Sequence, residues 1–203
     1  MRKPLAVLIF IFIAFLVLAV AYPGAASEYS AVPQEQEEAD HSANEAFDQM
    51  MAVLTHKRCV NCHPSDDSPK QGEDSHPHRF GVLRGADNHG MPAVRCNTCH
   101  QSENNSFSGV PGAPEWSLAP MSMQWEGLSR TEIAKSMLDR SKNGNRSHEE
   151  LTHHLTEHEL VLWAWEPGLD AEGRPREKPP VSKEAYIAAV KAWFDSGAII
   201  PEE

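Results

Sequence analysis

The hydrophobic positions divide the chain into an apolar leader and a polar remainder that holds short amphipathic segments. Residues 5–21 are unbroken apolar sequence behind Arg2 and Lys3, followed by small-residue cleavage sites at 19–21 or 24–26. This pattern predicts a signal peptide over residues 1–27. The run of 17 residues is also just long enough to span a bilayer, so a retained N-terminal anchor is the alternative.

The next segment, residues 28–41, is acidic, contains Pro33 and lacks apolar periodicity, which predicts a flexible tether. A helix is expected to begin at Ser42, because Ser42 and Glu45 form a capping-box pattern. Apolar residues then follow at helical spacing, at Phe47, Met50, Met51 and Leu54.

The rest of the chain, residues 42–203, reads as one mainly α domain with short helices and long loops. Capping boxes at Ser129–Glu132 and Ser147–Glu150 each predict a short helix, and a last helix is expected over 183–196, ending at Gly197. Residues 64–95 and 101–124 are rich in turn formers and predict loops. We expect Phe47 of the first helix to pack on Trp193 and Phe194 of the last.

Two five-residue motifs account for all four cysteines, Cys59-Val60-Asn61-Cys62-His63 and Cys96-Asn97-Thr98-Cys99-His100. Two thiols at this spacing form thioether bonds to the vinyl groups of haem, and the following histidine becomes the proximal iron ligand. The sequence therefore predicts two covalently bound c-type haems, with His63 and His100 as proximal ligands. Covalent haem also supplies the apolar core that a loop-rich chain lacks.

Three other interpretations fit the cysteine spacing. They are a four-cysteine zinc site, two structural disulfides and a thioredoxin-like redox pair. Zinc and disulfides leave a histidine after both pairs unexplained, and the redox pair lacks its strand-to-helix context. Because His63 and His100 are only 37 positions apart, both haems are expected in one domain and close together.

The sixth ligands are less constrained by the sequence. His154 lies between Leu151 and Leu155 on the buried side of its expected helix, with His158 one turn later as the alternate. For the other haem, the loop candidates are His78, with His76 as alternate, and Met123 in a proline-bearing loop; methionine coordination would raise the reduction potential. A five-coordinate iron is the remaining alternative.

The net charge indicates which class of macromolecule the protein is expected to bind. The formal charge is −11 and becomes about −13 when Arg2 and Lys3 leave with the leader. So acidic a surface argues against nucleic acid and anionic lipid, and favours a protein partner with a basic docking patch. Membrane association is expected only if the N-terminal segment is retained.

From position 58 onward the chain resembles small proteobacterial dihaem c-type cytochromes, some of which are labelled as a subunit of isoquinoline 1-oxidoreductase. The resemblance rests on RCVNCHP (58–64), GEDSHPH (72–78), RG (84–85), RCNTCH (95–100), LAP (118–120), MQW (123–125), NGNR (143–146) and WAWEPG (163–168). It implies an electron-transfer role, possible service as the cytochrome subunit of an oxidoreductase complex, and His78, Met123 and His154 as iron ligands.

The sequence thus predicts a periplasmic dihaem electron carrier that has no catalytic residues of its own. It would connect a dehydrogenase with a downstream acceptor. The alternatives are a small haem enzyme, a peroxidase or reductase with one open iron, and a redox or gas sensor. Two six-coordinate, CO-unreactive irons distinguish the carrier from both.

Overall fold

The computed structural model describes residues 34–202, with side chains described from Glu38 onward. The predicted leader, residues 1–27, and residues 28–33 of the predicted tether lie outside this part of the chain. Within residues 34–202, no helix is both long enough and apolar enough to cross a membrane. The described residues belong to one compact unit that starts at Pro33.

The first helix, α1 (Gln34–Leu54), begins eight residues before the expected start at Ser42. Residues 34–41 are therefore helical and not the flexible tether that their acidity suggested. The physical reason is that glutamate, glutamine and alanine are good helix formers, and acidic side chains near a helix N-terminus interact favourably with the helix dipole. Farther along, Phe47, Met50 and Met51 are fully buried, as the apolar spacing predicted.

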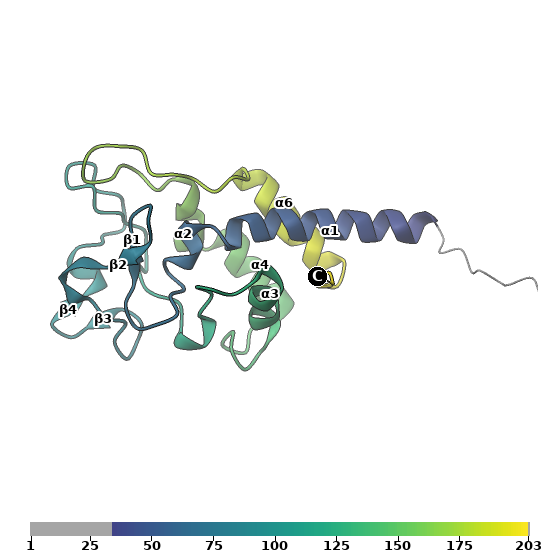
Figure 1. Ribbon diagram of the computed structural model, residues 1–203, viewed down its shortest axis with the longest axis horizontal. Helices are drawn as coiled ribbons and strands as arrows, with labels where there is room; N and C mark the ends of the chain where they lie inside the picture. The colour runs from purple at the N-terminus through teal and green to yellow at the C-terminus, as the bar shows by residue number, and fades with distance from the viewer. Residues whose placement is uncertain (1–33, 203) are drawn as a thin grey trace, which may run out of the picture. The chain divides into compact units, whose positions relative to one another are not determined.

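The last helix, α6 (Lys183–Asp195), packs against α1, which confirms the predicted contact between the two ends of the domain. Figure 1 shows α6, in yellow, crossing the blue α1. The ring centroids of Phe47 and Trp193 are 5.9 Å apart. Ser182 caps α6 through the Ala185 amide, and Gly197 follows its end with a φ of +94°, a conformation that favours glycine.

Two further helices begin at the predicted capping boxes. Ser129 caps α3 (Arg130–Leu138), Ser147 caps α4 (His148–Glu157), and in both the third helical residue is a glutamate that completes the box. The chain continues through α5 (Glu159–Leu162) and the 3₁₀ turn η4 (Trp163–Trp165). Buried residues of α1, α3, α4 and α6 form one hydrophobic core.

The loop region carries short ladders that the sequence did not predict. Strand β1 (Lys70–Gln71) pairs with β2 (His76–Pro77), and β3 (Gly90–Met91) pairs with β4 (Val94–Arg95), both antiparallel. Three 3₁₀ turns complete the region, η1 (Arg79–Gly81), η2 (Cys96–Thr98) and η3 (Met121–Met123). Strands of two residues are too short to show an alternating pattern, so the prediction of mainly helix with long loops describes these residues well.

Candidate functional site

The first cysteine motif is built on a single turn at the end of α2 (Lys57–Val60). The amide of Cys62 donates to the Cys59 carbonyl at 3.0 Å, and the His63 amide donates to the Val60 carbonyl at 2.9 Å. These bonds continue the helical turn past α2. They bring both thiols and the imidazole of one motif onto the same short piece of backbone.

Residues 119–126 pack against this turn and form hydrogen bonds with it. The Ala119 amide donates to the Cys62 carbonyl at 3.0 Å, and the Trp125 amide donates to the His63 carbonyl at 2.9 Å. The Trp125 ring stacks on the His63 ring, with centroids 3.6 Å apart and planes 10° apart. His63 Nδ1 lies 2.7 Å from the Met123 carbonyl oxygen. Because a carbonyl can only accept, Nδ1 carries the proton and Nε2 is left as the metal-binding nitrogen.

A cavity of about 380 Å³ opens beside this motif. Cys59, Cys62 and His63 line it, and His154 of α4 lines it as well. Much of the remaining wall is apolar, formed by Leu54, Leu118, Met137, Leu151, Leu155, Leu160 and Val161. A cavity with two thiols, an imidazole and apolar walls has the chemistry that a covalently bound haem requires, so the residues present fit that group.

Of the predicted sixth ligands, the structure brings His154, its alternate His158 and Met123 to the wall of this cavity. His63 and His154 interact electrostatically. Burial lowers the pKa of His63 to about 4, and the positive charge that His154 would carry contributes to that shift. Burial, followed by Arg146, lowers the pKa of His154 to about 4 as well. Both rings are therefore neutral at pH 7, which is the form that binds a metal.

The other predicted candidates near this cavity are placed differently. Met123 lines it and is buried, but its own backbone carbonyl accepts the His63 Nδ1 proton, on the side of the ring away from the metal-binding nitrogen. His158 ends α4 instead of continuing it, and its Nε2 lies 3.5 Å from Glu115. His153 is exposed and pairs with Glu157 at 3.3 Å.

The second motif sits on the turn η2, directly after the β3–β4 hairpin. The Cys96 amide donates to the His89 carbonyl at 2.9 Å, and the His100 amide donates to the Cys96 carbonyl at 2.9 Å. His100 Nδ1 lies 2.7 Å from the Pro111 carbonyl, and the ring stacks on Trp116 at 4.6 Å with planes 5° apart. Both motif histidines thus have the same two partners, a backbone carbonyl and a parallel tryptophan.

His78 faces the second motif. Its ring centroid is 6.0 Å from that of His100, at an interplanar angle of 68°. This places His78 beside His100, where it could act as a second ligand to a group bound by that histidine. His78 Nδ1 lies 2.7 Å from the Arg79 carbonyl, which again leaves Nε2 free. The alternate, His76, directs its Nδ1 to Asp74 at 2.6 Å, which likewise leaves its buried Nε2 without a partner, so it is the ring contact with His100 that favours His78.

The two motifs lie close enough to interact. Burial raises the pKa of Cys62 to about 11, and the thiolate form of Cys96 adds to this shift. His89 contacts both regions, since its side chain lines the first cavity and its carbonyl accepts from Cys96. Two haems bound here would be neighbours, as the spacing of 37 residues predicted.

The surroundings of the four cysteines can be compared with the zinc, disulfide and redox-pair interpretations of the two motifs. Burial, followed by the Cys62 charge, raises the pKa of Cys59 to about 12, whereas a reactive redox dithiol needs a lowered one. All four cysteines are free thiols. Among residues 34–202, no three His, Cys, Asp or Glu side chains gather as a metal-binding group, so the thiols do not converge on one zinc site.

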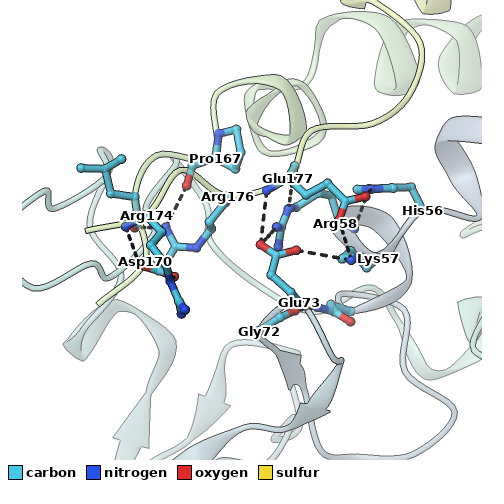
Figure 2. Close-up of polar contacts among 12 residues, drawn as sticks. His56, Lys57, Arg58, Gly72, Glu73, Pro167, Asp170, Arg174, Arg176 and Glu177 are labelled. Atoms are coloured by element: carbon cyan, nitrogen blue, oxygen red, sulfur yellow. Dashed lines mark hydrogen bonds and ion pairs between the residues drawn. The ribbon is translucent and has the colours of Figure 1, made fainter. Parts of the chain in front are cut away.

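A polar cluster attaches the first motif to the segment between η4 and α6, which we call the C-terminal connector (Figure 2). Arg58, next to Cys59, has a buried guanidinium that donates to the Glu73 carboxylate and, through Nε, to the Glu177 carbonyl at 2.8 Å. Lys57 Nζ reaches the Glu177 carboxylate at 2.8 Å. These contacts join α2, the β1–β2 turn and the connector. No motif or spacing in the sequence predicts that these three segments meet.

Comparison of the chain with protein-family models, with curated proteins and with solved structures found no match.

Proposed function

We propose that this protein is an exported dihaem c-type cytochrome that carries electrons between redox proteins. The observation that supports it best is a duplicated arrangement. In each Cys-x-x-Cys-His motif, the histidine commits Nδ1 to a backbone carbonyl at 2.7 Å, stacks on a tryptophan and has one further histidine within electrostatic reach. Such a hydrogen bond is the usual partner of a metal-binding imidazole, because it fixes both tautomer and ring orientation.

The proposal gives each residue a role. Cys59 and Cys62 hold one haem and Cys96 and Cys99 the other, through thioethers, with His63 and His100 as proximal ligands. Haem bound in this way supplies a one-electron redox centre. We assign His154 to the first site and His78 to the second as sixth ligands. We prefer His154 to Met123 because the Met123 backbone lies on the Nδ1 side of His63.

A carrier role is favoured over an enzyme or a sensor by the second histidine at each site. If His154 and His78 both bind iron, each haem iron would have two histidine ligands besides the four porphyrin nitrogens, and no position would be left for a substrate or a gas. The acidic surface favours redox partners with basic docking patches, and the predicted leader supports export to the periplasm. The resemblance to small dihaem cytochromes points to the same role.

The test is to express the full chain with its leader and a cytochrome maturation system, and to determine haem content and spectra. We expect two covalent haems in the pyridine haemochrome assay and a low-spin spectrum that CO does not change. Two haems with a CO-shifted Soret band would replace the carrier with an enzyme or sensor. Fewer than two covalent haems would contradict the assignment of one motif.

A further inference from the structure

Each candidate site has a nearby arginine that forms no direct ion pair among residues 34–202, although Glu150 interacts with Arg146, and Asp170 and Glu73 with Arg176, at longer range. In the first cavity this is Arg146, whose side chain lines the wall close enough to His154 to contribute, after burial, to the lowered pKa of that ring. At the second site it is Arg176, whose positive charge contributes, after burial, to the lowered pKa of His100. Among residues 34–202, neither guanidinium lies within 4 Å of a carboxylate, although the structure contains many arginine–carboxylate pairs.

Arg146 is held in place by its own loop. Its Nη1 donates to the Asn143 carbonyl at 2.8 Å, and its amide donates to Asn143 Oδ1 at 2.8 Å. Asn143 is only 1% exposed, and its amide group is anchored in turn on the Met137 carbonyl at 2.8 Å. A buried asparagine therefore fixes the backbone of the loop so that the arginine lines the cavity. Among the described residues, only Nη1 of its two terminal nitrogens has a hydrogen-bond partner.

Arg176 is held by backbone carbonyls only. Its Nη1 donates to the carbonyls of Pro167, at 2.8 Å, and Leu169, and its Nη2 donates to that of Gly109. Figure 2 shows the guanidinium reaching toward Pro167 from the chain segment that also bears Glu177. Burial, followed by the charge of Arg58, lowers the pKa of Arg176 by more than the charges of Asp170 and Glu73 raise it, so the surroundings on balance oppose this cation.

A half-buried guanidinium without a carboxylate in direct contact is costly, and proteins ordinarily pair it. Arginine also matches a carboxylate with two parallel donors. We propose that Arg146 and Arg176 are anion anchors, one for each site, and that each binds a carboxylate of the group held by the neighbouring cysteine pair. This inference rests on the proposed function, because the carboxylates it requires are the propionates of haem.

The chain offers matched controls for both anchors. Arg140 belongs to the same loop as Arg146, but its guanidinium is bonded to Asn145 and does not line the cavity. Arg174 precedes Arg176 by two residues, has a 72% exposed side chain and pairs with Asp170 and Glu172. Substitution of a control by glutamine removes the same charge from nearly the same place in the chain.

The experiment is a redox titration of the holoprotein and of four variants, Arg146→Gln, Arg176→Gln, Arg140→Gln and Arg174→Gln. Loss of a positive charge beside a haem favours its oxidised form. We therefore expect Arg146→Gln to lower one midpoint potential and Arg176→Gln to lower the other. The expected change is about tenfold in the ratio of reduced to oxidised protein, or about 59 mV for a one-electron couple. High salt should leave these shifts in place, since buried charges are poorly screened.

Two results would overturn the anchors while leaving the cytochrome intact. One is two haems per chain with unchanged potentials in both anchor variants. The other is control variants that shift the potentials equally. Where a glutamine variant fails to retain haem, Arg146→Lys and Arg176→Lys keep the charge but lose the two parallel donors. Redox-difference infrared spectra of these variants should show displaced haem carboxylate bands, and unchanged bands would equally reject the proposal. Absence of haem from the unmodified protein would reject the proposed function itself.

Discussion

The two cysteine motifs share one arrangement at the level of the rings but are supported by very different parts of the protein. The first continues a helix, and Cys59 packs against the core formed by α1, α3, α4 and α6. The second lies on a 3₁₀ turn between loops, where Cys99 is exposed. The repeated carbonyl and tryptophan partners point to one chemistry at both sites. The packing around the two motifs differs, so we expect the first site to contribute more to the stability of the domain. We expect the second site to be more accessible to a redox partner.

The largest expected difference between the sites is in folding. We expect Cys59→Ser with Cys62→Ser to abolish the folded domain, whereas Cys96→Ser with Cys99→Ser should leave a helical domain with one haem. Without haem, the apolar walls of this 380 Å³ cavity would lose the group that they pack against. A typical domain is stable by only about 5–15 kcal/mol, so the loss of that packing is enough to unfold it. Circular dichroism melting curves and covalent haem staining measure both outcomes, and equal stability of the two double variants would contradict the comparison.

Removal of the sixth ligands is expected to have the next largest effect. His154→Ala and His78→Ala should each convert one of two haems to a high-spin, CO-binding form. The second should react with CO faster if its site is the more open one. His153→Gln is the matched control for His154, since His153 is exposed and paired with Glu157, and His76→Gln tests the alternate to His78. An unchanged spectrum in His154→Ala would transfer the ligand role to His158 or Met123.

The sequence predicted the helices because their signals are local. Ser129, Ser147 and Ser182 each cap a helix through contacts with residues three positions away, so the capping pattern is visible in the sequence. The start of α1 was missed because acidity was interpreted as disorder, although glutamate also favours helix. The spacing of Leu151, His154 and Leu155 likewise brought His154 correctly to the buried side of α4.

The support of each site could not be predicted in the same way. His63 bonds to a carbonyl 60 residues away and His100 to one 11 residues away. Every residue has a carbonyl, so the sequence carries no sign of which one is used. Arg146 and Arg176 were missed for a related reason, because a surface arginine and one lining a cavity look alike in the sequence.

A smaller effect is expected from acid. The folded-state pKa values of His63 and His154, both about 4, lie below the ordinary value of 6.5. Between pH 6.5 and 4 the unfolded chain therefore binds more protons than the folded one, and stability falls as the pH falls. For His63 the loss is up to about 3 kcal/mol. Denaturant titrations at pH 7 and pH 4.5 measure it, and His154→Gln should reduce the difference. Equal stability at both pH values would show that neither ring is held neutral.

The smallest expected effect is a difference between Trp125, which stacks on His63, and Trp116, which stacks on His100. Trp125→Phe should cost about 1 kcal/mol, the usual contribution of an aromatic pair, because it weakens the stack on His63. The loss is moderated because the Trp125 Nε1 atom is buried without a partner, and phenylalanine removes that unsatisfied donor. Trp116→Phe also disturbs the edge contact with Trp163, at 4.9 Å, but this ring is less buried. If the first site is central to stability, Trp125→Phe should lower the melting temperature more, while Trp116→Phe should mainly change the potential of one haem. The reverse order would mean that the loops, and not the helical core, limit the stability of the domain.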